Sequence, residues 1–231
     1  MTLRSRRADP VELGSEFSFP ASDPPAWMGS TSTASPSEQP ATSSADAAGA
    51  TAAPTLAVPV GSSDHAQGPA DAPVTLVVYG DFECPFSRKA RTVIRAVRSR
   101  RGDSFRYVFR NFPLEDKHPH AFRSSEAAEA AGAQGGYWEM HHALFDAPWA
   151  LEERDLERYA ARLGMDMERF RRDMAEHAHA PRIRADMDGG VRSGVHGTPT
   201  YFVNGISYVN LEDDPQRLDD ALDRAAWPPP H

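Results

Sequence analysis

The stretch VTLVVYGDFECPFS, residues 74–87, joins a predicted strand to a predicted helix through the one cysteine of the sequence. Residues 74–79 are mostly apolar and β-branched, a run typical of a strand buried on both faces. Gly80 ends that run, and Pro85 suits the first helical position, where no N–H donor is needed. Cys84 is therefore expected at a helix N-terminus. Unpaired N–H groups and the helix dipole there favour a thiolate over a thiol.

Ser87 stands three residues after Cys84, where a Cys-x-x-Cys redox pair carries its second thiol. Because the sequence holds one cysteine, Cys84 has no partner within it for an internal disulfide. The Ser87 hydroxyl could donate a charge-assisted hydrogen bond to the thiolate. The motif thus offers an attacking sulfur without a neighbouring thiol to resolve a mixed disulfide.

The residues that follow this motif predict an α/β domain. Apolar side chains recur with helical spacing at Phe86, Ala90, Val93, Ile94 and Val97. Aromatic residues then alternate with other side chains over residues 105–110, as in a second strand. A strand, a helix and a strand in such short order imply a right-handed parallel βαβ unit.

The rest of the chain is predicted as a helical block followed by a hairpin and a last helix. Residues 115–194 show helical spacing and helix end signals throughout. An Asn-Gly pair at 204–205 separates two strand-like runs and suits the type I′ turn of a β-hairpin. Asp213 or Asp214 is expected to cap the final helix.

The N-terminal part has a different composition. Residues 1–65 are predicted to be a disordered Ser/Ala/Pro-rich tail, because they hold too few apolar side chains to offset the entropy of ordering. Within it, Phe17–Trp27 places aromatic residues in a Pro-rich frame. This segment is either a short docking motif for a partner or part of a tail with incidental aromatics.

Charge and hydropathy narrow the function classes. The formal net charge is −8, which argues against a nucleic-acid partner on bulk electrostatics. We expect no membrane span, since no apolar run is long enough to cross a bilayer. Arg4, Arg6 and Arg7 suggest a secretion signal, but no apolar region follows them. A cytoplasmic location is therefore expected.

Short motifs are spread along the chain from residue 64 onward. They are Asp64-His65, Gly68–Thr75, Tyr79–Pro85, Asn111–Leu114, His118–Ala121, Ala127–Gly132 and Gly197–Gly205. Together they resemble the DsbA-like branch of the thioredoxin superfamily. The resemblance implies an α/β thioredoxin-like fold with an inserted α-helical domain. The core would comprise residues 66–114 and 195–228, and the insert residues 115–194.

The resemblance also implies roles for individual residues. Cys84 matches the family's nucleophile, and the serine three residues later stands where the family usually has its second cysteine. Pro85 and Phe86 match the dipeptide between those two positions, which faces the substrate. Thr198-Pro199 matches the cis-proline loop that lies opposite the nucleophile. In the family this loop holds a substrate peptide in extended form, as an added strand.

Nearby charges could modulate the ionisation of the thiol. His196 abuts the Thr198-Pro199 loop, and as a cation it would favour the thiolate, whereas an inward-pointing Glu83 would oppose it. Val78 stands six residues before the nucleophile, where related reductants often bury a carboxylate, so no base is evident there. No metal site is predicted, because the histidine pairs lack zinc-like spacing.

Three functions agree with these features. The first is a monothiol oxidoreductase without a bound cofactor, in which Cys84 attacks protein or peptide disulfides and an external thiol such as glutathione resolves the mixed disulfide. The second is a catalytically degenerate thioredoxin-fold module that binds extended peptides. The third is a glutathione-dependent transferase or isomerase, since related folds use one Ser or Cys to activate glutathione.

Overall fold

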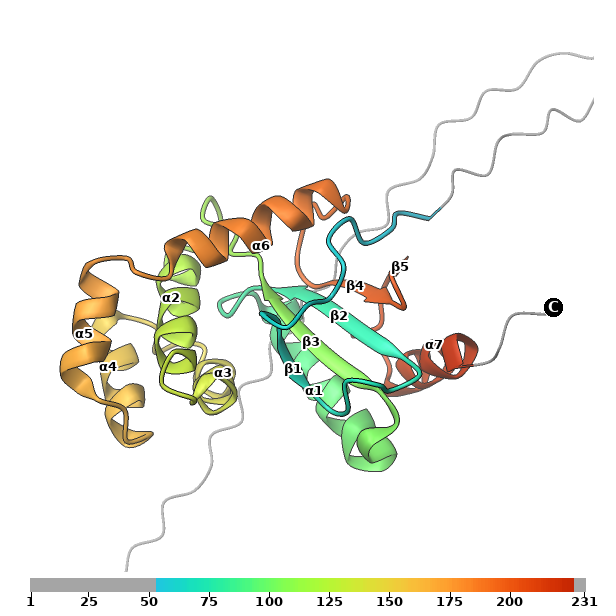
Figure 1. Ribbon diagram of the computed structural model, residues 1–231, viewed down its shortest axis with the longest axis horizontal. Coiled ribbons are helices and arrows are strands. Elements are labelled where there is room, and N and C mark those ends of the chain that lie inside the picture. The colour runs from blue at the N-terminus through green and yellow to red at the C-terminus, as the bar shows by residue number, and fades with distance from the viewer. Residues whose placement is uncertain (1–52, 227–231) are drawn as a thin grey trace, which may run out of the picture. The chain divides into compact units, whose positions relative to one another are not determined.

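In a computed structural model, the structure describes residues 53–226. This part of the chain forms a five-stranded sheet with helices on both faces and a separate group of helices at one end (Figure 1). The elements are, in order, β1 His65–Gln67, β2 Thr75–Gly80, α1 Pro85–Arg101, the 3-10 turn Gly102–Ser104, β3 Arg106–Asn111, α2 Ala121–Gly132, α3 Tyr137–Asp146, α4 Glu153–Arg162, α5 Met167–Ala175, α6 Ala180–Arg192, β4 Thr200–Val203, β5 Ile206–Tyr208 and α7 Pro215–Ala226.

The strand order in the sheet is β1-β3-β2-β4-β5. β2 and β3 are parallel, as the βαβ pattern predicts, and the other neighbouring pairs are antiparallel. Because successive side chains of a strand point to opposite faces, Leu76 and Val78 enter one core while Val77 and Tyr79 enter the other. Burial on both faces explains the continuous apolar run in β2.

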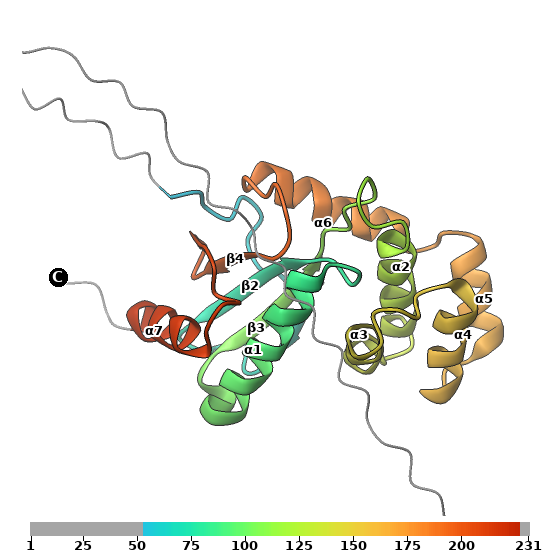
Figure 2. The ribbon, with the colours of Figure 1, turned by 180° about the vertical axis from the view of Figure 1, so that it is seen from behind.

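Each face of the sheet is covered by different helices. α1 and α7 pack together on one face, where Ile94, Val97 and Leu222 join the larger core (Figure 2). α6 contacts β3 on the other face. There a Cβ at Gly190 would lie 2.8 Å from the Phe112 ring, so the helix approaches the sheet closely because it carries a glycine.

The helical group is built around α2, which contacts α3, α4, α5 and α6. Five alanines of α2 are fully buried, at positions 121, 127, 128, 130 and 131. Their small side chains let several helices approach one axis. α6 is the last helix of the predicted 115–194 insert. Because it contacts both α2 and β3, it packs against the sheet as well as against the helical group.

The C-terminal elements follow the sequence prediction. Asn204 and Gly205 both have positive φ angles, 48° and 82°, as a type I′ turn requires, and they join β4 to β5. Asp214 Oδ1 accepts a hydrogen bond from the N–H of Gln216 at 2.9 Å, so Asp214 is the residue that caps α7.

Residues 1–65 are predicted to be disordered, and this prediction is wrong for residues 53–65, which contact or join the sheet. The Leu56 N–H donates to the Gly205 carbonyl at 2.8 Å, and Thr55 forms a bridge with Ile206. His65–Gln67 forms β1, a strand too short for periodicity to reveal. Residues 1–52, with the Phe17–Trp27 segment, lie outside the described residues.

A buried ion pair fastens this N-terminal segment. Arg110 donates from Nε and Nη2 to the Asp64 carboxylate at 2.8 and 3.0 Å, and it also donates to the carbonyls of Val58 and Pro59. Burial by itself raises the pKa of Asp64, but hydrogen bonds from Arg110 and the Gly61 N–H outweigh it and hold that pKa below its ordinary value. The N-terminal segment is therefore held against the sheet by Arg110, a residue of β3.

Among residues 53–226, no helix has both the length and the apolar character needed to cross a membrane.

Candidate active site at Cys84

Cys84 occupies the position just before α1, with extended backbone angles, φ −72° and ψ 122°. Pro85 is the first helical residue, and the Cys84 carbonyl accepts the Arg88 N–H at 3.1 Å. The thiol therefore lies at the N-terminal end of a 17-residue helix, as predicted. The residue is only 4% exposed.

The sheet brings this thiol to the loop before β4. The register of β2 and β4 pairs Tyr79 with Thr200, so the end of β2 and the start of β4 meet at one edge. There the Cys84 Sγ donates a hydrogen bond to the Thr198 carbonyl oxygen at 3.2 Å, across 114 residues of sequence. The Thr198–Pro199 peptide bond is cis.

Ser87 is buried within the first turn of α1 and is 3% exposed. Its Oγ accepts the Asp81 N–H at 3.2 Å, so the side chain holds the loop that precedes the helix. A hydrogen bond from the hydroxyl proton to a Cys84 thiolate stays a prediction. The serine has a structural contact that a sulfur at this position would make less well.

Asp81 is a buried carboxylate three residues before Cys84. It is fully buried, and its Oδ1 accepts the Glu83 N–H at 2.8 Å. Its Oδ2 accepts the Leu114 N–H at 2.9 Å and contacts His118 Nδ1 at 2.7 Å. Val78 lies six residues before the cysteine, where related reductants often bury a carboxylate, whereas the buried carboxylate of this chain lies three residues before the cysteine. An acidic residue directly after a buried strand was the available signal.

The two candidate modulators of the thiol lie in different settings. Glu83 Oε2 accepts the His120 N–H at 2.7 Å, which directs the carboxylate to the start of α2. His196 is exposed and lines a groove together with Phe86, Thr198 and Pro199. An influence of either residue on Cys84 stays a prediction.

A groove of about 590 Å³ lies next to the Cys84 site; Phe86, Thr198 and Pro199 line it, whereas Cys84 itself does not. Phe86 and Val209 both line this groove, and they are 59% and 76% exposed. Phe86 shares the helical spacing of Ala90, Val93, Ile94 and Val97, but those residues are buried and Phe86 is exposed. The first turn of α1 begins at the edge of the sheet, and Phe86 instead borders the groove.

The paired histidines have other roles in this fold. His118 contacts Asp81, His177 Nδ1 contacts Glu126 at 2.8 Å, and His141 is buried among aromatic rings. In the part of the chain from residue 53 to residue 226, no group of three or more His, Cys, Asp or Glu side chains is arranged to hold a metal ion.

A cysteine at the start of α1, opposite a proline loop, on a sheet interrupted by a helical group, defines a protein with a thioredoxin fold. The family model described as thioredoxin matches residues 61–224, and the chain belongs to that family.

Solved structures agree with this assignment. BdbD from Bacillus subtilis, in its oxidised form, superposes with a TM-score of 0.65 at 20% identity, covering 76% of this chain and 98% of that one. Wolbachia pipientis alpha-DsbA1 gives 0.62 at 17% identity over 74% and 94% of the two chains. At these identities the likeness shows the fold alone. A thioredoxin-like oxidoreductase from Silicibacter pomeroyi gives 0.61 at 28% identity over 70% and 91%.

Curated relatives with higher identity carry a different name. The Na(+)/H(+) antiporter NhaA 1 of Salinispora arenicola is 49% identical over 151 residues, which is 65% of this chain and 23% of the antiporter. NhaA 1 of Mycolicibacterium vanbaalenii is 46% identical over 147 residues, 63% and 24% of the two sequences. The chain thus spans about a quarter of the length of the curated relatives it matches.

Proposed function

We propose that this protein is a monothiol thiol–disulfide oxidoreductase in which Cys84 forms mixed disulfides that an external thiol resolves. The observation that carries the proposal is the Cys84 Sγ, which lies at the N-terminus of α1 and 3.2 Å from the Thr198 carbonyl oxygen. The antiporter name of the curated relatives does not enter the proposal, because the chain spans about a quarter of their length.

The first step is attack of the Cys84 thiolate on one sulfur of a substrate disulfide. A bond forms between Cys84 and that sulfur, the substrate S–S bond breaks, and the other sulfur leaves as a thiolate. The N-terminal end of α1 stabilises the attacking anion through its unpaired N–H groups. The thiol proton leaves to solvent or to a base before attack.

The second step needs a thiol from outside the protein. The Ser87 hydroxyl cannot attack a disulfide as a thiolate does, so the mixed disulfide waits for a small thiol such as glutathione. The incoming thiolate bonds to the substrate sulfur, and Cys84 leaves as a thiolate again. Disulfide bonds are exchanged throughout, with no net oxidant required.

The groove between Phe86 and Val209 would hold the substrate peptide. Thr198 and Pro199 line it, and the Thr198 carbonyl contacts the Cys84 sulfur, so an extended peptide bound there would run past that sulfur. The exposed apolar side chains supply binding area that a soluble surface otherwise avoids. Protein or peptide disulfides are therefore the substrate class proposed.

Glutathione-dependent reduction of 2-hydroxyethyl disulfide tests this proposal. We expect turnover that requires glutathione and that Cys84→Ala abolishes. A matched Ser124→Ala variant, which alters a buried serine on α2, keeps the activity. Absence of turnover in the parent protein at any glutathione concentration, or equal turnover in Cys84→Ala, would contradict the proposal.

A second candidate function is peptide binding without chemistry. It is favoured by the 4% exposure of Cys84 and by the serine at position 87, because both limit thiol exchange. Under this alternative the groove binds an extended segment and the Cys84 sulfur takes no part in a covalent step. A fluorescent peptide that binds the parent and Cys84→Ala equally well, with no mixed disulfide in the parent, would favour it over the oxidoreductase.

A further inference from the structure

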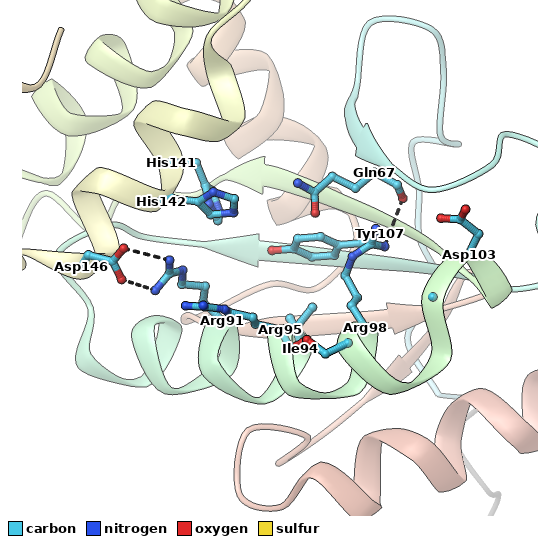
Figure 3. Close-up of a pocket in the computed structure, with 12 residues that line it drawn as sticks. Gln67, Arg91, Ile94, Arg95, Arg98, Asp103, Tyr107, His141, His142 and Asp146 are labelled. Atoms are coloured by element: carbon cyan, nitrogen blue, oxygen red, sulfur yellow. Dashed lines mark hydrogen bonds and ion pairs between the residues drawn. The ribbon is translucent and has the colours of Figure 1, made fainter. Parts of the chain in front are cut away.

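A second hollow lies on the far part of α1, away from Cys84. It has a volume of about 560 Å³, is open to solvent and is lined mainly by residues of α1, β3 and α3 (Figure 3). Figure 3 shows three arginines on α1 facing His141 and His142 on α3, with the Tyr107 ring of β3 between them. Cavities of roughly 300–1,000 Å³ are the usual size for small-molecule sites.

The arginines Arg91, Arg95 and Arg98 lie on one face of α1 because they are spaced by four and three residues. Two carboxylates also line the hollow, Asp103 and Asp146. Asp146 forms two hydrogen bonds with Arg91 and so neutralises that guanidinium locally.

The other two arginines are less well compensated. Arg98 donates to the Gln67 carbonyl at 3.4 Å, and burial lowers its pKa, with Asp103 opposing that shift. Arg95 pairs with no carboxylate among residues 53–226. The hollow therefore presents a guanidinium surplus that suits an anion, since the guanidinium fork matches carboxylates and phosphates.

His141 supplies the second observation. It is 1% exposed, it lines the hollow, and neither ring nitrogen has a hydrogen-bond partner. Burial, with nearby His142 and Arg91, lowers the pKa of His141 well below its usual value, so the ring is neutral and carries one donor and one acceptor. Arg91 Nε is also buried without a partner. Buried polar atoms are normally paired, so two such groups at one hollow favour a polar group bound beside them.

We propose that this hollow binds a small organic anion, whose carboxylate or phosphate contacts Arg95 and Arg98 and whose uncharged polar end hydrogen-bonds His141. The body of the molecule would lie along the Tyr107 ring and Ile94, which give the hollow an apolar wall. The site lies apart from the Cys84 groove, with which it shares no lining residue. It is therefore independent of the redox function proposed above.

Calorimetric titration in Tris chloride with three probes tests this site: benzoate, 4-hydroxybenzoate and phenyl phosphate. We expect 4-hydroxybenzoate to bind with a dissociation constant on the order of 1 mM. Its hydroxyl reaches toward His141, so it should bind about fivefold more tightly than benzoate. Comparison of benzoate with phenyl phosphate shows which anionic group the arginines prefer.

Two variants and a matched control identify the contacts. Arg95→Gln should weaken every probe by about tenfold, because it removes a charge-assisted contact. Arg88→Gln makes the same charge change on α1, at a residue that lies over Trp149 outside the hollow, and should alter affinity less than twofold. His141→Phe fits among Phe109 and Phe145 and should make 4-hydroxybenzoate and benzoate bind equally.

Three results would overturn the proposal. If no probe gives a heat of binding at a concentration ten times the expected dissociation constant, the hollow does not bind small organic anions. Equal weakening by Arg88→Gln and Arg95→Gln would show diffuse attraction of anions to α1. A hydroxyl preference that survives in His141→Phe would show that the imidazole contacts nothing. The Arg95 result decides the matter even if His141→Phe does not fold.

Discussion

At position 87 a serine hydroxyl stands where a dithiol site would have a second thiol, and its oxygen accepts a hydrogen bond from the Asp81 N–H. Ser87 lies in the first turn of α1, three residues after Cys84, so the two side chains share one end of the helix. Ser87→Cys is expected to allow an internal disulfide with Cys84. Insulin disulfide reduction should then rise on the order of tenfold or more over the parent, because the mixed disulfide can be resolved from within.

Ser124→Cys provides the control for added thiol content. Ser124 is a fully buried serine on α2, so the variant carries the same number of sulfurs with the second one on another helix. It should leave insulin reduction at the parent level. Equal activity of the two cysteine variants would show that position 87 does not control the chemistry.

The Asp81 carboxylate organises the loops around the site. It accepts hydrogen bonds from two backbone N–H groups and contacts His118 while fully buried. Asp81→Ala leaves those donors without a partner and should lower the free energy of unfolding by about 3 kcal/mol. His118→Gln removes one contact only and should cost about 1 kcal/mol, as measured by urea unfolding. Equal costs would show that the backbone contacts of Asp81 contribute little.

Asp186 gives a pH-dependent prediction. Burial raises its pKa to about 6, although Arg182 and the Asn111 N–H favour the charged form. Because the folded pKa lies above the unfolded value of about 3.9, the folded chain binds the proton more tightly between these pH values. The stability that Asp186 contributes therefore falls as pH rises from about 4 to about 6.

The Asp186→Asn variant tests this pH dependence, when its free energy of unfolding is compared with that of the parent protein at several pH values. The amide keeps the shape and an acceptor for the Asn111 N–H but carries no charge. We expect the variant to be more stable than the parent by roughly 2 kcal/mol at pH 7 and nearly equal at pH 4, by urea unfolding. A variant that is less stable at pH 7 would show that the Arg182 contact outweighs desolvation.

At the scale of elements, the buried Arg110–Asp64 pair holds the segment before β1. Asp64→Ala leaves the Arg110 guanidinium buried with carbonyl and hydroxyl partners only. The free energy of unfolding should fall by about 3 kcal/mol. Hydrogen exchange at Leu56, which is bonded to Gly205, should become faster as the segment loosens.

Asp71→Ala is the matched control, since Asp71 is an exposed aspartate close in sequence. It should change the free energy of unfolding by less than about 0.5 kcal/mol. If Asp64→Ala and Asp71→Ala have equal effects, the ion pair does not fasten the segment.

Elements with strong local signals were predictable from sequence. β2, α1, the parallel pairing with β3, and the Asn204–Gly205 hairpin each combine periodicity with a turn or cap residue, and the structure confirms them. β1 and the ordered residues 53–64 have no such signal. They form because Arg110 and the edges of the sheet offer partners that only the folded molecule assembles.

The same limit applies to the site. The place of Cys84 was predictable from the local strand-to-helix pattern, and that of the Thr198-Pro199 loop followed from the family resemblance. The Asp81 contacts with Leu114 and His118 were not, since they join a strand end to a loop more than 30 residues away. The His141 hollow depends on helices α1 and α3, whose mutual placement no local pattern shows.

For the whole molecule, α6 joins the two parts of the fold. It contacts α2 at one end of its length and β3 along the sheet, so the helical group and the sheet share an element. The Cys84 groove lies at the edge of the sheet where β2 ends and β4 begins. A substrate in that groove would contact the sheet side of the molecule, while the anion hollow lies between the sheet and α3.

The most direct test of the redox claim is the lifetime of a mixed disulfide on the full chain. The protein is mixed with a peptide disulfide in the absence of free thiol and followed by intact mass. We expect one peptide adduct per chain, located at Cys84, that persists until glutathione is added and then disappears. An adduct that never forms, or one that decays without any added thiol, would contradict the monothiol mechanism.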